Sequence, residues 1–123
     1  MAEISPQVEN QLRQYQETQQ QLQTVLIQRQ QMELTVRELE QTVTALTELA
    51  DGVPIYRSVG TLLVGVKDAA ALRSELAEQK ETMEVRLKSV RRQEDGLRER
   101  LETLQTTLEK LLGGGPGARP DTS

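Results

Sequence analysis

Along most of this sequence, apolar residues recur three or four positions apart. A short central segment lacks this spacing and separates the two regions that have it. Before residue 51 these positions are Val8, Leu12, Tyr15, Leu22, Val25, Met32, Val36, Leu39, Val43, Leu46 and Ala50. After residue 68 they are Leu72, Leu76, Met83, Leu87, Val90, Leu97, Leu101, Leu104, Leu108 and Leu111. This spacing is typical of a coiled coil, in which two helices bury narrow apolar stripes against each other. We therefore predict two long helices that pair.

Four polar residues fill slots in these stripes. They are Gln19 and Arg29 before the central segment, and Gln79 and Glu94 after it. With these assignments the heptad register shifts once in each helix, as a stammer in the first and a stutter in the second.

The composition excludes several classes of protein. The 123 residues include no Phe, Trp, Cys or His and only two Tyr, so a thick aromatic core, a disulfide framework and the commonest metal ligand are absent. The net charge of −4 and the lack of a basic stripe argue against nucleic-acid binding. No apolar run approaches the ~18 residues of a membrane span. We expect no enzyme, no metal or other cofactor, and no membrane or nucleic-acid partner.

Capping residues and glycines divide the chain into four parts. Ser5-Pro6 predicts a helix start, Asp51-Gly52 a helix end, Asp68 a second start and Gly113 a second end. The predicted parts are an N-terminal coiled-coil helix (1–51), a β-hairpin assembly segment (52–67), a C-terminal coiled-coil helix (68–112) and a disordered tail (113–123). The predicted fold class is mainly α, a long antiparallel two-helix coiled coil with a central hairpin.

An antiparallel pairing brings the two stripes together around a single fold-back point. It places Val8 near Leu111 and Leu22 near Leu97. Two helices from separate chains would produce the same pattern, so the sequence leaves that alternative open.

The central segment, "IYRSVGTLLVGV" at residues 55–66, reads as two strands joined by Gly60-Thr61. One predicted face carries Arg57 and five apolar residues, Ile55, Val59, Leu62, Val64 and Val66. Because an isolated hairpin is marginal in water and exposes its edges, we expect hairpins from several chains to complete a shared β-barrel. A folded-back linker is the alternative. A phosphate loop is disfavoured because the lysine of "GTLLVGVK" comes one place late and Asp68 replaces the Ser or Thr.

Three stretches carry a family resemblance: "YRSVGTLLV" at the centre, "SPQVENQLRQYQETQQQLQ" before it and "MEVRLKSVRRQEDGLRERL" after it. Over about residues 4–112 the chain resembles the beta-type subunits of prefoldin. The resemblance implies a cytoplasmic, ATP-independent chaperone hexamer of two alpha and four beta subunits. In it, the β-hairpins form the platform and the coiled-coil arms hold unfolded client proteins at their tips for a group II chaperonin. The implied partners are a prefoldin alpha subunit, other copies of this chain, unfolded clients and the chaperonin.

The tip of an antiparallel arm contains both ends of the chain. Helix ends fray because their last turns lack hydrogen-bond partners, so apolar side chains there can reach a client. The candidate client-binding residues are Ile4, Val8, Leu12, Leu108, Leu111 and Leu112. The alternative function is a passive scaffold or tether that oligomerises through its hairpin. Such a protein would have the same heptad pattern.

Overall fold

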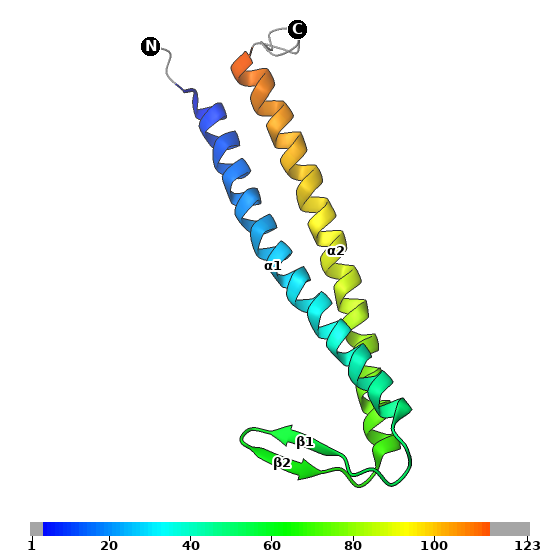
Figure 1. Cartoon of the computed structure of the whole chain (residues 1–123). Helices are drawn as coiled ribbons and strands as arrows, with labels where there is room; N and C mark the ends of the chain where they lie inside the picture. Colours follow the sequence, from blue (N-terminus) through cyan, green and yellow to red (C-terminus); the bar gives the residue numbers. More distant parts are fainter. Residues whose placement is uncertain (1–3, 114–123) are drawn as a thin grey trace, which may run out of the picture. The chain divides into compact units, whose positions relative to one another are not determined.

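The computed structural model describes residues 4–113. Two long helices flank a two-stranded antiparallel hairpin, in the order α1 (Pro6–Glu48), β1 (Tyr56–Val59), β2 (Leu62–Gly65) and α2 (Ala69–Gly113) (Figure 1). The mainly helical fold with a central hairpin is therefore confirmed. The tail predicted to be disordered lies, from residue 114 onward, outside the described residues.

The chain divides into two compact units. The terminal unit contains residues 4–29 and 90–113, and so holds the start of α1 and the end of α2. The hairpin unit contains residues 30–89, with the remaining parts of both helices and the two strands.

The predicted caps and turns form as expected. The Ser5 hydroxyl accepts a hydrogen bond from the Val8 amide at 3.1 Å, and the Asp68 carboxylate accepts one from the Ala71 amide at 3.0 Å. Each cap satisfies a backbone N–H that the first helical turn leaves without a partner. Gly52 and Gly60 have φ values of +83° and +60°, the left-handed region that glycine enters most easily. Both helix starts and both glycine turns therefore lie within a few residues of their predicted positions.

The core of the terminal unit is a single seam between the two helices. Its buried side chains are Val8, Thr18 and Val25 from α1, and Val90, Glu94, Leu104 and Leu108 from α2. Two polar contacts give the direction of pairing, because Thr18 meets Arg100 whereas Arg29, further along α1, meets Glu94, earlier in α2. The two segments of this unit therefore pack antiparallel.

One seam position of α1 is occupied by a different residue from the one predicted from heptad spacing. Thr18 is buried whereas Gln19, the residue assigned to that slot, is exposed. With Thr18 in place, the steps from Tyr15 through Leu22 to Val25 alternate as three, four and three. The two consecutive steps of three therefore move back to Leu12, Tyr15 and Thr18, and the small hydroxyl side chain of Thr18 occupies the seam while the longer glutamine stays in water.

A similar correction applies to α2 in the hairpin unit. Lys80 is partly buried and Gln79 is exposed, so the steps from Leu76 through Met83 to Leu87 alternate as four, three and four, and the two consecutive steps of four lie instead at Leu72, Leu76 and Lys80. The methylene stem of lysine can lie along the seam while its ammonium group stays near water. Lys80 Nζ lies 3.8 Å from Glu40 Oε2 of α1.

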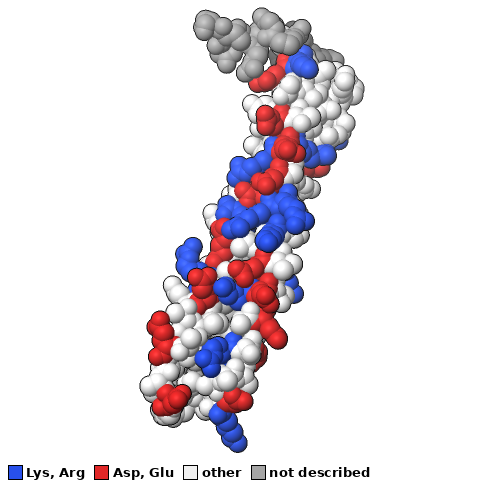
Figure 2. Space-filling model, turned by 90° about the vertical axis from the view of Figure 1, so that its right-hand side faces the viewer, with Lys and Arg blue, Asp and Glu red and all other residues white. Residues whose placement is uncertain are grey.

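The outer faces of the helices are polar. Figure 2 shows basic and acidic side chains interleaved along the visible face rather than gathered into a continuous basic stripe. Within residues 4–113, neither helix is long and apolar enough to cross a membrane. The same residues contain no cluster of three or more acidic side chains arranged to hold a metal ion.

Candidate assembly and tip surfaces

The hairpin has the register that alternation predicts. Arg57 pairs with Val64 and Val59 pairs with Leu62, while the flanking Ile55 accepts a hydrogen bond from the Val66 amide at 2.9 Å. Side chains on one strand alternate between faces. The five apolar residues predicted for one face therefore do share it, and Arg57 lies on the same face.

Both faces of the hairpin are open to solvent. All eight strand residues are exposed, including Leu62 at 65% and Leu63 at 74%. Figure 1 shows the hairpin projecting from the helix ends that flank it. A four-residue strand pair with this much exposed apolar surface has little to hold it in water unless another surface covers it.

An ion pair connects the hairpin to the second helix. Arg57 Nη1 on β1 lies 3.6 Å from Glu75 Oε2 on α2. Both side chains are about half exposed, so the pair contributes little to stability.

The predicted tip residues divide into two groups. Val8 and Leu108 are buried in the seam, and Leu12 is partly buried. Ile4, Leu111 and Leu112 are exposed, at 54%, 36% and 66%. The start of α1 and the end of α2 lie at the same end of the terminal unit (Figure 1). The buried group closes the seam, and we call the three exposed residues, which lie just before the start of α1 and at the end of α2, the tip patch.

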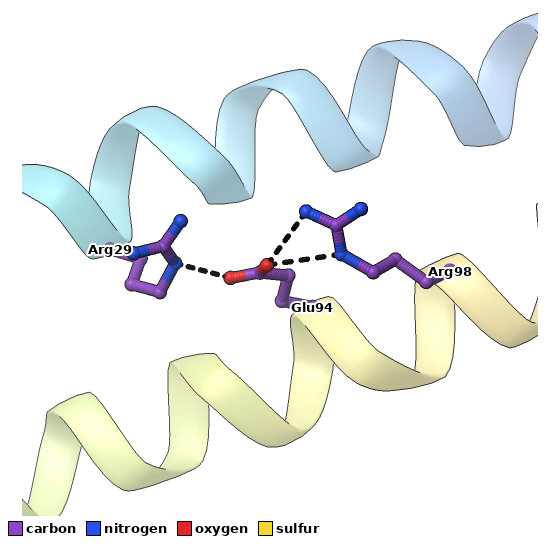
Figure 3. Close-up of polar contacts among 3 residues, drawn as sticks. All are labelled: Arg29, Glu94 and Arg98. Atoms are coloured by element: carbon purple, nitrogen blue, oxygen red, sulfur yellow. Dashed lines mark hydrogen bonds and ion pairs between the residues drawn. The ribbon is translucent and has the colours of Figure 1, made fainter.

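A charged cluster that the sequence only partly predicts lies deeper in the terminal unit. Glu94 Oε1 accepts a hydrogen bond from Arg29 Nε across the seam, and Glu94 Oε2 lies 3.0 to 3.1 Å from the guanidinium nitrogens of Arg98 (Figure 3). Burial by itself would raise the pKa of Glu94. The hydrogen bonds and positive charges of Arg98 and Arg29 outweigh it and lower the pKa overall.

Sequence spacing placed Arg29 and Glu94 in the seam but gave no role to Arg98 or Thr18. The position of Arg98 four residues after Glu94, on the same helix face, is the signal that would have found it. The Arg100 contact with Thr18 had no such local signal, because the two residues are far apart in the chain.

An open groove of about 770 Å³ lies beside α1 in the terminal unit. Its lining consists of Arg13, Gln16, Glu17, Gln19, Gln20, Leu22, Gln23, Leu26 and Leu101. These residues supply amide, aliphatic and charged groups but no pairing of a nucleophile with a base, so the groove does not suggest catalysis.

Comparison with known proteins gives one consistent result. A family described as "Prefoldin subunit" matches residues 9–115. The chain is 44% identical to the prefoldin subunit beta of Archaeoglobus fulgidus over 117 residues, which cover 95% of this chain and all of that protein. It is 40% identical to the prefoldin subunit beta of Methanothrix thermoacetophila, covering 93% of this chain and 94% of the relative. Its fold matches the crystal structure of the prefoldin beta subunit from Thermococcus strain KS-1 with a TM-score of 0.79 and 38% identity, covering 91% of this chain and 97% of that one.

Proposed function

Since the chain belongs to the prefoldin subunit family, we propose that it is a beta-type subunit of an ATP-independent chaperone that holds non-native proteins at its arm tips. In this proposal the subunit works in the cytoplasm and passes its clients to a group II chaperonin. Its site is the tip patch, and its assembly surface is the hairpin.

The observation that carries the proposal is the exposure of Ile4, Leu111 and Leu112 at the end of a seam that is otherwise closed. A non-native protein exposes apolar segments that a folded one buries, and these side chains can cover such segments. Burying one of them contributes about 1.5–3 kcal/mol before ordering costs. A single tip therefore binds weakly and releases readily, without nucleotide hydrolysis.

Several tips acting on one client would convert weak contacts into useful affinity. This requires assembly, and the exposed apolar residues of the hairpin support it. We propose that hairpins of this chain and of an alpha-type partner close a shared barrel in a hexamer of two alpha and four beta subunits. Val59, Leu62 and Val64 would then lie inside the barrel.

The test uses the chain assembled with an alpha-type partner and a chemically denatured enzyme diluted without ATP. Replacing Ile4, Leu111 and Leu112 by Ser should remove most suppression of light scattering, while native mass spectrometry shows an unchanged assembly. The matched control replaces Ile27, Leu34 and Val85 by Ser, because these residues are exposed to a similar degree but lie away from the tip patch. The control should retain wild-type activity.

Two results would reject the proposal. If the wild-type assembly fails to suppress aggregation of any denatured enzyme tried, the chain acts as a passive coiled-coil tether. If the tip variant and the control lose the same activity, binding does not depend on the tip patch.

A further inference from the structure

Two polar contacts cross the seam of the terminal unit, where a coiled coil ordinarily carries only apolar side chains. One is the ion layer, in which Glu94 of α2 pairs across the seam with Arg29 of α1 and also with Arg98 of its own helix (Figure 3). The other is the hydrogen bond that Arg100 Nε donates to Thr18 Oγ1 at 3.3 Å. Thr18 is 2% exposed and Glu94 is 8% exposed. Both acceptors therefore lie within the seam and not on its surface.

A gain in the stability of the folded chain does not explain why these polar contacts lie in the seam. Removing a carboxylate and a guanidinium from water costs free energy that their mutual attraction often fails to exceed, and apolar replacements of similar size are frequently neutral or stabilising. A polar layer in a coiled coil instead makes one alignment of the helices better than the others. Any other alignment leaves a charge in the seam without its partner.

The apolar part of the seam does not make that choice by itself. Leucine and valine recur at heptad spacing, so a slip of one heptad would bring apolar residues opposite each other again. The ion layer does not survive such a slip. Arg29 would then face Leu87 or Leu101, and Glu94 would face Leu22 or Val36.

We propose that Arg29, Glu94 and Arg98, together with Thr18 and Arg100, select the antiparallel register in which α1 and α2 pair. They are specificity-determining residues of the arm. Register matters for this fold because it sets which residues of the two helix ends lie together, whatever those ends bind. The inference concerns the pairing of the helices and does not rest on the proposed function.

The hairpin unit offers a chemical reporter of register. Lys80 Nζ and Glu40 Oε2 are 3.8 Å apart, so a zero-length carbodiimide reagent should join them in the native register. Since α1 and α2 are each uninterrupted helices, a slip in the terminal unit would reach this pair. Lys80 would then couple to Glu33 or Glu48, about one heptad away on either side.

The decisive variant replaces both Arg29 and Glu94 by Leu. After refolding of the full chain, carbodiimide treatment and peptide mass spectrometry, we expect the products of Lys80 with Glu33 or Glu48 to rise about tenfold relative to the Lys80–Glu40 product. The thermal midpoint should be unchanged or higher. The matched control replaces Arg13 and Glu102, which are exposed residues of the same two helices, by Leu, and should give the wild-type products.

A second variant keeps the test valid if the double-leucine chain fails to fold. Arg29→Glu, Glu94→Arg and Arg98→Glu together invert every charge of the ion layer and preserve its attractions. This variant should return the single Lys80–Glu40 product. The inference is overturned if the folded double-leucine variant gives only that product, or if the charge-inverted variant gives slipped products.

Discussion

Glu94 is a carboxylate at a position where heptad spacing would ordinarily place leucine. Two guanidinium groups, from Arg98 and Arg29, hold it in the ionised form and lower its pKa against the opposing effect of burial. Because its pKa is lower in the folded chain than in the unfolded chain, the ionised group stabilises the fold at pH values above its usual pKa, near 4.5. That contribution is lost as the pH falls through the lowered folded-state value.

Replacing Glu94 by Gln should therefore alter the response to acid. At neutral pH the variant should melt at a lower temperature than the wild type, because the amide cannot neutralise Arg29 in the seam. Between about pH 5 and pH 3 its midpoint should fall less steeply, because it has no carboxylate to protonate. Circular dichroism melting curves at several pH values measure both effects. Glu102→Gln, on the exposed face of α2, should keep the wild-type slope, and an equal slope for Glu94→Gln would contradict the expectation.

At the scale of elements, the hairpin differs from the helices in having no partner within its own unit for most of its surface. Val59 and Leu62 face each other across the strands, and both are exposed. If other chains cover this face, two aspartates here would repel each other and would also have to be desolvated on assembly. The helices, which bury their own seam, should be unaffected.

Val59→Asp combined with Leu62→Asp should therefore give helical chains that no longer assemble with an alpha-type partner. Native mass spectrometry reports assembly, and circular dichroism reports helix content. Ser58→Asp combined with Leu63→Asp changes the next cross-strand pair, which lies on the opposite face, and should assemble better than the first variant. An intact assembly of the Val59 and Leu62 variant would refute the role of this face.

Sequence reasoning predicted the elements well because their signals are local. Ser5, Asp68, Gly52 and Gly60 act through hydrogen bonds or backbone angles within a few residues of themselves. The seam was predicted less accurately, since Thr18 and Lys80 occupy slots that had been assigned to the adjacent glutamines. Helical spacing alone allows either neighbour, and the packing of the facing helix decides between them.

The division of the tip residues also depended on that packing. Heptad spacing places both Leu108 and Leu111 in the stripe and does not distinguish the buried Leu108 from the exposed Leu111. The difference appears only once the end of α2 lies against the start of α1. The client-binding and barrel-forming roles stay predictions, because each depends on a surface that another molecule supplies.

At the scale of the whole molecule, the proposed chaperone depends on the number of tips that engage one client. Among the described residues, each tip patch contains the three exposed apolar side chains Ile4, Leu111 and Leu112, and a single patch of that size binds weakly. When several weak sites share a scaffold, each bound tip raises the effective concentration of the next, so affinity grows much faster than the number of sites. Activity should therefore depend steeply on the fraction of functional tips.

That dependence can be measured by assembling mixtures of wild-type chain and the Ile4, Leu111 and Leu112 serine variant with the alpha-type partner. At equal proportions, suppression of aggregation should fall well below half of the wild-type value, because most assemblies would lack several tips. Native mass spectrometry gives the composition of each mixture, and mixtures with the Ile27, Leu34 and Val85 serine variant should keep full activity. A decline in strict proportion to the variant fraction would mean that each arm binds clients by itself, and the long paired helices would then need an explanation other than simultaneous grasp by several arms.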